Sequence, residues 1–151
     1  MRNVLVFLFF ALATCQIPCT VVSSSVDPNC FLVFRFHMYI INSIPEDIVV
    51  HVNSKDDDLG NRTLPLGGSR DWSFCAPGWT RFRGEFWWGS KYISFNVFDD
   101  YVDDNCDEKA VLRTRHCYWL IRHDGFYIGP KNETWPNWGN WDLVWTWPSS
   151  M

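Results

Sequence analysis

The residues with the most chemistry in this sequence are six cysteines, whose thiols can form disulfides, bind metal ions or act as nucleophiles. They are Cys15, Cys19, Cys30, Cys75, Cys106 and Cys117. No Cys-x-x-Cys pair occurs, so neither a zinc knuckle nor a thioredoxin-like site is predicted. Removal of the first two with an N-terminal leader would leave four, and an even number in a small exported domain predicts disulfides.

Histidines and serines form no catalytic pattern. Ser69 follows two glycines, but the Gly-x-Ser-x-Gly elbow of a hydrolase is missing. His37 and His51 stand in predicted β-structure and could be neighbours, yet without a partner motif we interpret them as half-exposed strand residues. His116 and His123 also have no partner motif. We therefore predict that the protein is not an enzyme and uses no cofactor.

Two acidic runs could offer oxygen ligands to a metal ion. The first is Asp56–Asp58, and the second extends from Asp99 to Glu108. A calcium loop needs alternating acids, a glycine and a bidentate glutamate at fixed spacing, and neither run has that pattern. Solvated loops are therefore predicted, with no metal site.

The N-terminus has the pattern of a secretory signal peptide. Arg2 precedes the apolar run Val4–Ala13, and Val22 and Ser24 suit the −3 and −1 positions of a cleavage site. We expect a signal peptide over residues 1–24 and a mature domain over 25–151. The rival interpretation, a membrane anchor, is disfavoured because the run is too short to span a bilayer. A secreted protein that is not inserted in a membrane is predicted.

Composition and sequons agree with an exported recognition domain. The 151 residues fit one domain, and 18% aromatics can build a sizeable core. A net charge of −4 without a basic cluster argues against a nucleic-acid partner. Asn61 and Asn132 begin N-glycosylation sequons, each of which needs exposure on a loop in the secretory pathway.

Alternating apolar residues predict several short strands. Ile48, Val50 and Val52 share one face of a strand over residues 47–53, and a second alternating run, 81–88, ends at the turn Gly89–Ser90. Asp124–Gly125 predicts another hairpin. Further strands are expected over residues 34–41, 70–74, 92–98, 116–122 and 126–128.

The remaining segments show no periodicity. Residues 54–60 are expected to form a polar loop, residues 99–109 an acidic irregular segment, and no helix is predicted after the signal peptide. A tail rich in tryptophan begins at about residue 130. These short strands and closely spaced turns predict an all-β fold, a single antiparallel β-sandwich stabilised by disulfides.

A series of motifs, in one order, resembles the plant self-incompatibility protein family, the S-protein homologues. The resemblance covers roughly residues 35–128 and implies a small secreted β-sandwich ligand. The motifs are His51–Gly60, Trp72–Ser73–Phe74, Phe86–Trp87–Trp88, Phe95–Asp99, Cys117–Tyr118–Trp119 and Asp124–Tyr127.

The resemblance also implies a disulfide. Cys106 and Cys117 match the late cysteine pair of the family. The positions of its other pair are here Val52 and Gly84, so that bridge is expected to be lost. Cys30 and Cys75 are not at family positions. We expect them either to pair, which would stabilise the fold by about 3–4 kcal/mol, or to remain separate thiols.

The expected function is recognition of a cell-surface receptor protein by a monomeric ligand in cell-to-cell signalling, and the family name implies rejection of self pollen. Three loops are candidates, Ser54–Gly60, Asp99–Cys106 and Asp124–Gly125, because variation in loops costs little stability. The acidic loop is favoured for attracting a basic receptor patch, through Asp99, Asp100, Asp103 and Asp104.

The alternative is a lectin-like module that stacks sugars on tail tryptophans such as Trp138 and Trp141. For the tail we favour the interpretation that it closes one end of the sandwich, since a large exposed aromatic cluster would invite aggregation. The other tryptophans are expected to be core or sheet-face residues: Trp72, Trp87, Trp88 and Trp119.

Overall fold

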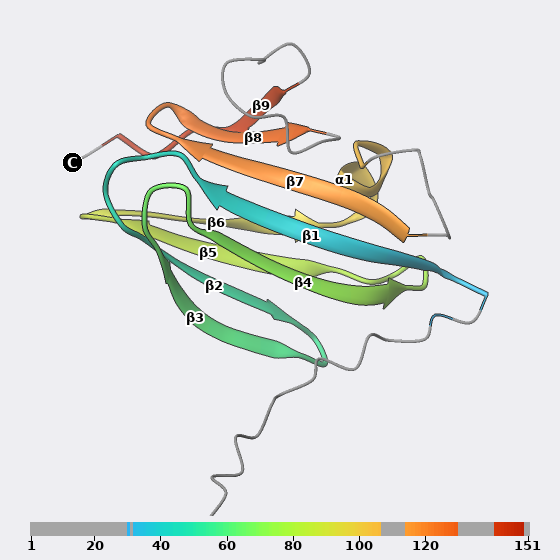
Figure 1. Cartoon of the computed structure of the whole chain (residues 1–151). Coiled ribbons are helices and arrows are strands. Elements are labelled where there is room, and N and C mark those ends of the chain that lie inside the picture. Colours follow the sequence, from blue (N-terminus) through green and yellow to red (C-terminus); the bar gives the residue numbers. More distant parts are fainter. Residues whose placement is uncertain (1–29, 31, 107–113, 130–140, 150–151) are drawn as a thin grey trace, which may run out of the picture.

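The strands form two stacked sheets (Figure 1) in a computed structural model that describes residues 30, 32–106, 114–129 and 141–149. One sheet has the order β4 (Ser69–Ala76), β1 (Phe34–Asn42), β7 (Thr114–Arg122), β8 (Gly125–Gly129) and β9 (Asp142–Trp145). The other has the order β3 (Asp58–Leu64), β2 (Ile48–Ser54), β5 (Phe82–Trp88) and β6 (Lys91–Phe98). The predicted all-β sandwich is confirmed.

Strand pairing is antiparallel except between β1 and β7, which run parallel from Arg35↔Thr114 to Asn42↔Ile121. Parallel neighbours need a long crossover, and here the crossover includes the whole second sheet. The pattern of alternation and turn signals identified β2, β5, β6, β7 and β8 correctly. Gly89 and Gly125 have φ values of 58° and 156°, which suits glycine at both predicted hairpin turns.

Three elements differ from the sequence-based expectation. Residues 58–64 form the edge strand β3, although residues 54–60 were expected to be a loop. The acidic segment contains a short helix, α1 (Asp100–Asp104), where no helix was expected. The tail contributes β9, which pairs with β8. In each case the side chains are mostly exposed, so hydrophobic alternation could not reveal the element.

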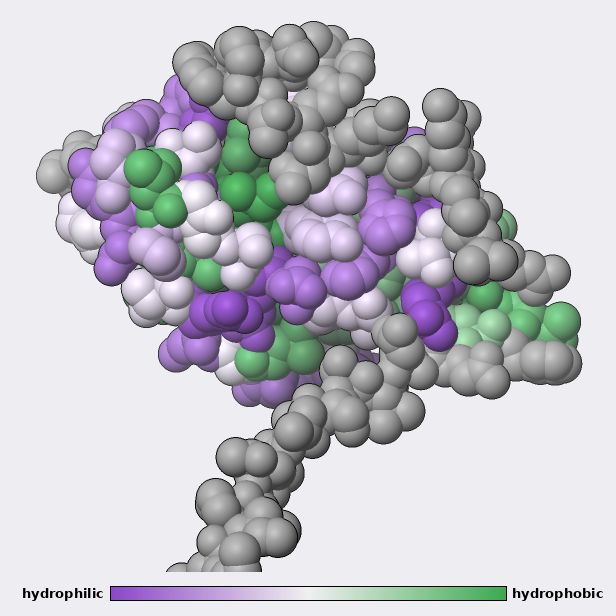
Figure 2. Space-filling model, viewed as in Figure 1, coloured by the Kyte–Doolittle hydropathy of each residue, from purple (hydrophilic) through white to green (hydrophobic). Residues whose placement is uncertain are grey.

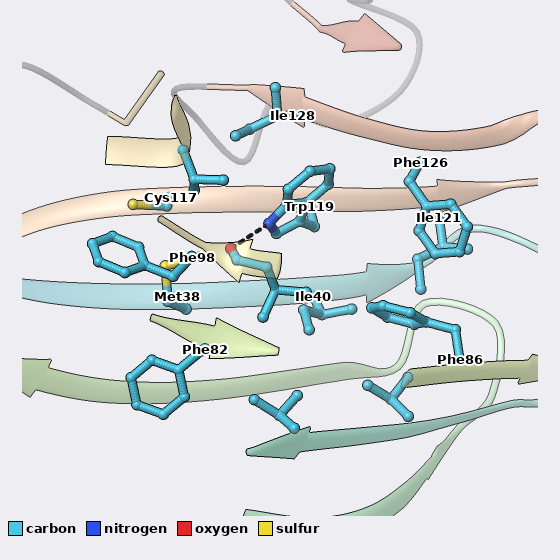
Figure 3. Packing of buried hydrophobic residues seen from close by; sticks show 14 of the residues in the cluster. Met38, Ile40, Phe82, Phe86, Phe98, Cys117, Trp119, Ile121, Phe126 and Ile128 are labelled. Atoms are coloured by element: carbon cyan, nitrogen blue, oxygen red, sulfur yellow. Dashed lines mark hydrogen bonds between the residues drawn. The ribbon is translucent and has the colours of Figure 1, made fainter. Parts of the chain in front are cut away.

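The core lies between the sheets and is dominated by aromatic rings (Figure 3). Trp119 on β7 is 1% exposed, and its indole Nε1 donates a hydrogen bond to the Val97 carbonyl oxygen on β6 at 2.9 Å. Phe95 and Phe126 pack against each other with ring centroids 5.0 Å apart. The predicted inward faces of β2 and β5 are buried, apart from the partly exposed Trp88.

The two family bridge positions, Val52 and Gly84, lie directly opposite each other on β2 and β5. Both are buried. A Cβ atom on Gly84 would lie 2.5 Å from Val97 Cγ1 and 2.7 Å from Phe86 Cε2. Val97 and Phe86 therefore fill the space beside Gly84.

The structure contains the disulfides Cys30–Cys75 and Cys106–Cys117. Cys75 is on β4, so the first bridge attaches the segment before β1 to the strand that pairs with β1. Cys106 follows α1, and Cys117 is a buried residue of β7. Among the described residues, no helix has the length and apolarity required to cross a bilayer. The expected boundary between signal peptide and mature domain, near residue 24, lies outside the described residues.

Candidate functional site

The loops divide between the two ends of the sandwich. The β2–β3 turn (54–57), the β4–β5 loop (77–81) and α1 lie at one end, which we call the loop end (Figure 1). The connections β1–β2, β3–β4, β5–β6 and β7–β8 lie at the opposite end, the turn end. Two of the three predicted recognition loops are therefore at the loop end, whereas Asp124–Gly125 is at the turn end.

The β2–β3 turn is fixed by short-range hydrogen bonds. The Ser54 hydroxyl accepts the backbone N–H groups of Asp56 and Asp57 at 3.2 and 2.9 Å. Asp58 Oδ1 accepts the backbone N–H of Gly60 at 2.8 Å. Asp side chains that stabilise such turns are common. The side chains of Asp56 and Asp57 are exposed on a turn whose shape is already determined.

The acids around α1 have two different roles. Asp99 is the N-cap, and its Oδ1 accepts the Val102 backbone N–H at 3.2 Å. Asp103 forms an ion pair with Arg115 on β7. Burial raises the pKa of Asp103, although the neighbouring Arg115 favours the charged form. Asp100 and Asp104 are exposed, so these two acids are the ones presented to solvent.

A cleft of about 270 Å³ opens between the β2–β3 turn and the β4–β5 loop. Phe74 and Phe82, both buried core residues, line it together with charged residues of the turn. Trp79 stands on its rim and is 81% exposed, the highest exposure among the large hydrophobic side chains of the described residues. The Pro77 carbonyl oxygen accepts bonds from the Thr80 backbone N–H and hydroxyl, at 2.9 and 3.0 Å, which fixes this loop.

The β4–β5 loop and α1 are linked to each other, and disulfides attach this end of the molecule to β4 and β7. Arg81 of the β4–β5 loop lies 3.7 Å from the Asp100 carboxylate on α1. Cys75, at the end of β4, lines the cleft and is bonded to Cys30. The second bridge, Cys106–Cys117, joins the end of α1 to β7. These links give the loop end a defined shape that a partner can recognise.

His37 and His51 are partly exposed strand residues, as interpreted from the sequence, and they are not neighbours because they lie on different sheets. His37 on β1 faces His116 on β7, with ring centroids 5.8 Å apart, and the stack continues through Tyr39 and Tyr118. The strand pairing of the two sheets, which could not be predicted, determines these neighbours. In the described part of the chain, no three metal-ligating side chains are grouped to hold an ion.

His51 is held between two carboxylates on the outer face of the second sheet. Its Nδ1 lies 2.9 Å from Glu85 Oε2, and its Nε2 lies 2.7 Å from Asp58 Oδ1. The hydrogen bonds to Glu85 and Asp58 raise the pKa of His51. The Tyr92 hydroxyl donates to Glu85 at 2.7 Å. This network stabilises the register of β2, β3 and β5, and part of the family motif at residues 51–60 serves it.

Most of the tryptophans that the structure describes pack against other aromatic side chains. Trp147 is 8% exposed, donates to the Arg122 carbonyl oxygen at 2.9 Å and packs on Phe126. Trp145 is half-exposed and stacks on Phe95, beside a cleft of about 380 Å³ between β6, α1 and β9. Trp138 lies outside the described residues, and Trp141 would contact any side chain placed at Gly129. The described tail residues favour end-capping over sugar binding.

The first sequon is exposed but is not on a loop. Asn61 belongs to the edge strand β3 opposite His51, and its side chain is exposed. Asn132 lies outside the described residues. The residue that sequence reasoning missed is Trp79. Its position in the sequence could have drawn attention to it. Trp79 directly follows Pro77–Gly78, a turn signal, and it belongs to no alternating apolar run that would place its side chain in the core.

Comparisons with known proteins agree with the motifs. A family model described as plant self-incompatibility protein S1 matches residues 37–147. The chain is 39% identical over 80 residues to S-protein homolog 2 of Arabidopsis thaliana, covering 52% of this chain and 48% of that protein. It is 31% identical over 93 residues to S-protein homolog 5 of the same plant, covering 59% and 66%. The chain thus spans about half to two thirds of the length of these relatives.

A solved structure has a similar fold, with a TM-score of 0.53 at 17% identity. The similarity covers 78% of this chain and 97% of the other. That structure is of self-incompatibility protein homologues, described as a widespread family of small, highly stable, secreted proteins from plants.

Proposed function

The chain belongs to the plant self-incompatibility protein S1 family, and on that premise we propose that it is an extracellular ligand for a cell-surface receptor protein. The protein is secreted, as sequence analysis predicted. The proposed ligand acts as a monomer in cell-to-cell signalling between plant cells, and rejection of self pollen is the specific role that the family name suggests. No enzymatic step is part of this proposal.

The observation that carries the proposal is the arrangement of the loop end. Both sheets use their inward faces for the core, whereas Asp56, Asp57, Asp100 and Asp104 are exposed on fixed loops. Rigid strands that carry exposed loops are a common arrangement for recognition. Four exposed carboxylates would attract a basic receptor patch and accelerate association at low ionic strength.

We assign two different roles to the four acids that the sequence predicts to contact the receptor. Asp100 and Asp104 face the partner, while Asp99 and Asp103 hold α1 through the N-cap and the Arg115 ion pair. Neutralising Asp103 would disturb folding as well as charge. The exposed pair is therefore the better place to test binding.

The test uses Asp100→Asn with Asp104→Asn. We expect the double variant to fold normally and to bind membranes of receptive plant cells several-fold more weakly at low salt, with the difference shrinking as salt rises. The matched control is Glu46→Gln with Asp47→Asn, which removes two exposed acids from the turn end. Circular dichroism checks folding, and titration of labelled protein at two ionic strengths gives the affinities.

Equal weakening by the control pair would attribute the effect to net charge alone and contradict a contact at α1. Unchanged binding of the well-folded Asp100/Asp104 variant would place the receptor contact elsewhere. Absence of saturable binding by the unmodified protein, on membranes from every receptive tissue tried, would contradict the ligand function itself.

A further inference from the structure

We infer that Trp79 and Leu32, with Phe34 beside them, form the apolar centre of the receptor contact, and that the partner is a protein with an apolar pocket rimmed by lysine and arginine. This inference rests on the proposed ligand function and specifies the chemistry of its partner. It draws on backbone conformation, exposure and charge at the loop end.

Leu32 combines an unusual backbone conformation with an exposed apolar side chain. Its φ is 65°, in the left-handed region that a bulky side chain rarely adopts, and its side chain is 78% exposed. The cause is local: Cys30 is bonded to Cys75 while Phe34 pairs with Ala76, so the chain must turn sharply between Cys30 and Phe34. Glycine or asparagine would suit this turn better. Because Leu32 is not buried, packing of its side chain does not offset the backbone strain. A role in binding is therefore the better explanation.

Trp79 and Phe34 place more apolar surface at the same end. Trp79 is 81% exposed and Phe34 is 49% exposed. Phe34 is opposite Ala76, and the β4–β5 loop that carries Trp79 begins directly after Ala76. Figure 2 shows hydrophobic surface at the end of the molecule where β1 begins. Exposed tryptophan beside a cleft is the residue type that most often dominates binding energy at protein interfaces.

The charges around this centre select the partner. Asp56 and Asp57 line the cleft across from Trp79, and Asp100 and Asp104 lie on α1. Lys55 and Arg81 offset part of this charge, and Arg81 is already beside Asp100. The acids outnumber the bases, so a basic protein surface is attracted and an anionic lipid surface is repelled.

The decisive variant is Leu32→Gly, because it should weaken binding without weakening the fold. Glycine adopts a φ of 65° without penalty, so the free energy of unfolding should be unchanged or slightly higher. Binding to membranes of receptive cells should fall roughly 10-fold, and Trp79→Ala should reduce it roughly 10- to 30-fold. Leu66→Ala is the matched control, since Leu66 is 60% exposed in the β3–β4 turn at the turn end.

Three arms complete the experiment. Binding should disappear when the membranes are treated with trypsin, and it should be absent from protein-free phosphatidylcholine vesicles with or without phosphatidylserine. Strong binding to the vesicles would overturn the inference in favour of a lipid surface. Unchanged binding of Trp79→Ala and Leu32→Gly, while Asp100→Asn with Asp104→Asn binds weakly, would overturn the apolar centre but leave the ligand function standing. If unmodified protein does not bind at all, both fail together.

Discussion

Gly84 is a residue whose missing side chain matters. It lies on β5 opposite Val52, and the space that its Cβ would occupy is taken by Phe86 and Val97. In a well-packed core an added methyl group forces neighbours out of their preferred rotamers. At the two positions where the resemblance implies a cysteine pair, this chain has Val52 and a closely packed Gly84.

We expect Gly84→Ala to lower the free energy of unfolding by roughly 1–3 kcal/mol, because Phe86 and Val97 must shift. Gly78→Ala is the control, since a Cβ there meets no atom within 4 Å. Guanidinium unfolding of both variants gives the comparison. A Gly84→Ala protein as stable as the control would show that the core at β5 is loosely packed.

His51 gives the protein a dependence of stability on pH. Its pKa is raised by Glu85 and Asp58, so its contribution is complete below its ordinary value of about 6.5 and is lost as pH rises through the raised pKa. His51 lowers the pKa of Glu85, and the Gly60 backbone N–H followed by His51 lowers that of Asp58. Their contribution is present above about pH 4 and is lost as pH falls through the lowered values.

The network should therefore stabilise the fold most between about pH 4 and about pH 6.5. We predict that His51→Gln flattens the decline in unfolding free energy from neutral to alkaline pH. The matched control for the loss of one histidine is His123→Gln, which changes a 59% exposed imidazole beside Glu46. Thermal or urea unfolding from acidic to alkaline pH provides the curves, and parallel curves for wild type and His51→Gln would refute the role of the network.

Among the elements, strands with one buried face could be predicted from the sequence, whereas elements with mostly exposed side chains could not. The alternation of Ile48, Val50 and Val52 marks β2 because one face is in the core. The strand β3 is an edge strand in which only Leu64 is fully buried, so its residues show no alternation. The helix α1 has a single buried side chain, Val102, and depends on the Asp99 cap and the Arg115 ion pair.

The role of the tail could be decided only from the structure. Tryptophan-rich sequence is compatible with packing and with exposure, and only β9 pairing on β8 decides between them for the described part. Trp147 then covers Phe126 and donates a hydrogen bond to Arg122, closing the turn end of the core. Trp145 remains half-exposed.

Trp147→Ala should accordingly cost about 3–5 kcal/mol of stability, from lost burial and the cavity left beside Phe126. Trp145→Ala should cost clearly less, since its ring is 47% exposed. Denaturant midpoints of the two variants test the order. A larger loss for Trp145→Ala would contradict the end-capping role of Trp147.

In the molecule as a whole, two disulfides stabilise a sandwich whose proposed recognition loops lie at one end. The Cys30–Cys75 bridge has a sequence separation of 45 residues and holds the segment before β1 against β4. In the chain-entropy account, a closed loop of this size stabilises by about 4 kcal/mol. The bridge therefore contributes a large part of the stability expected for a domain of this size.

Replacing both cysteines, Cys30→Ala with Cys75→Ala, should lower the unfolding free energy by about 4 kcal/mol while the sandwich still folds. The unfolding free energy in water, extrapolated from guanidinium curves with the slope fitted for each protein, measures this. A loss below about 1 kcal/mol would mean that β1 and β4 hold the segment without the bridge.

The candidate site was predictable only in part. The acidic segment was recognisable as a polar surface, but its sequence could not separate Asp103, which pairs with Arg115, from Asp104, which is exposed. That distinction depends on strand β7 being adjacent to α1. Trp79 and Leu32 could not be grouped, because the Cys30–Cys75 bridge and the β1–β4 pairing bring their segments to one end.

We propose that the receptor contacts the loop end of the sandwich. Hydrogen–deuterium exchange of the secreted protein, free and bound to membranes of receptive cells, tests it most directly. We expect slower exchange on binding in the β2–β3 turn, the β4–β5 loop and α1, with the turn end unchanged. Slower exchange confined to the turns at Gly89–Ser90 and Asp124–Gly125, at the opposite end of the sandwich, would contradict it.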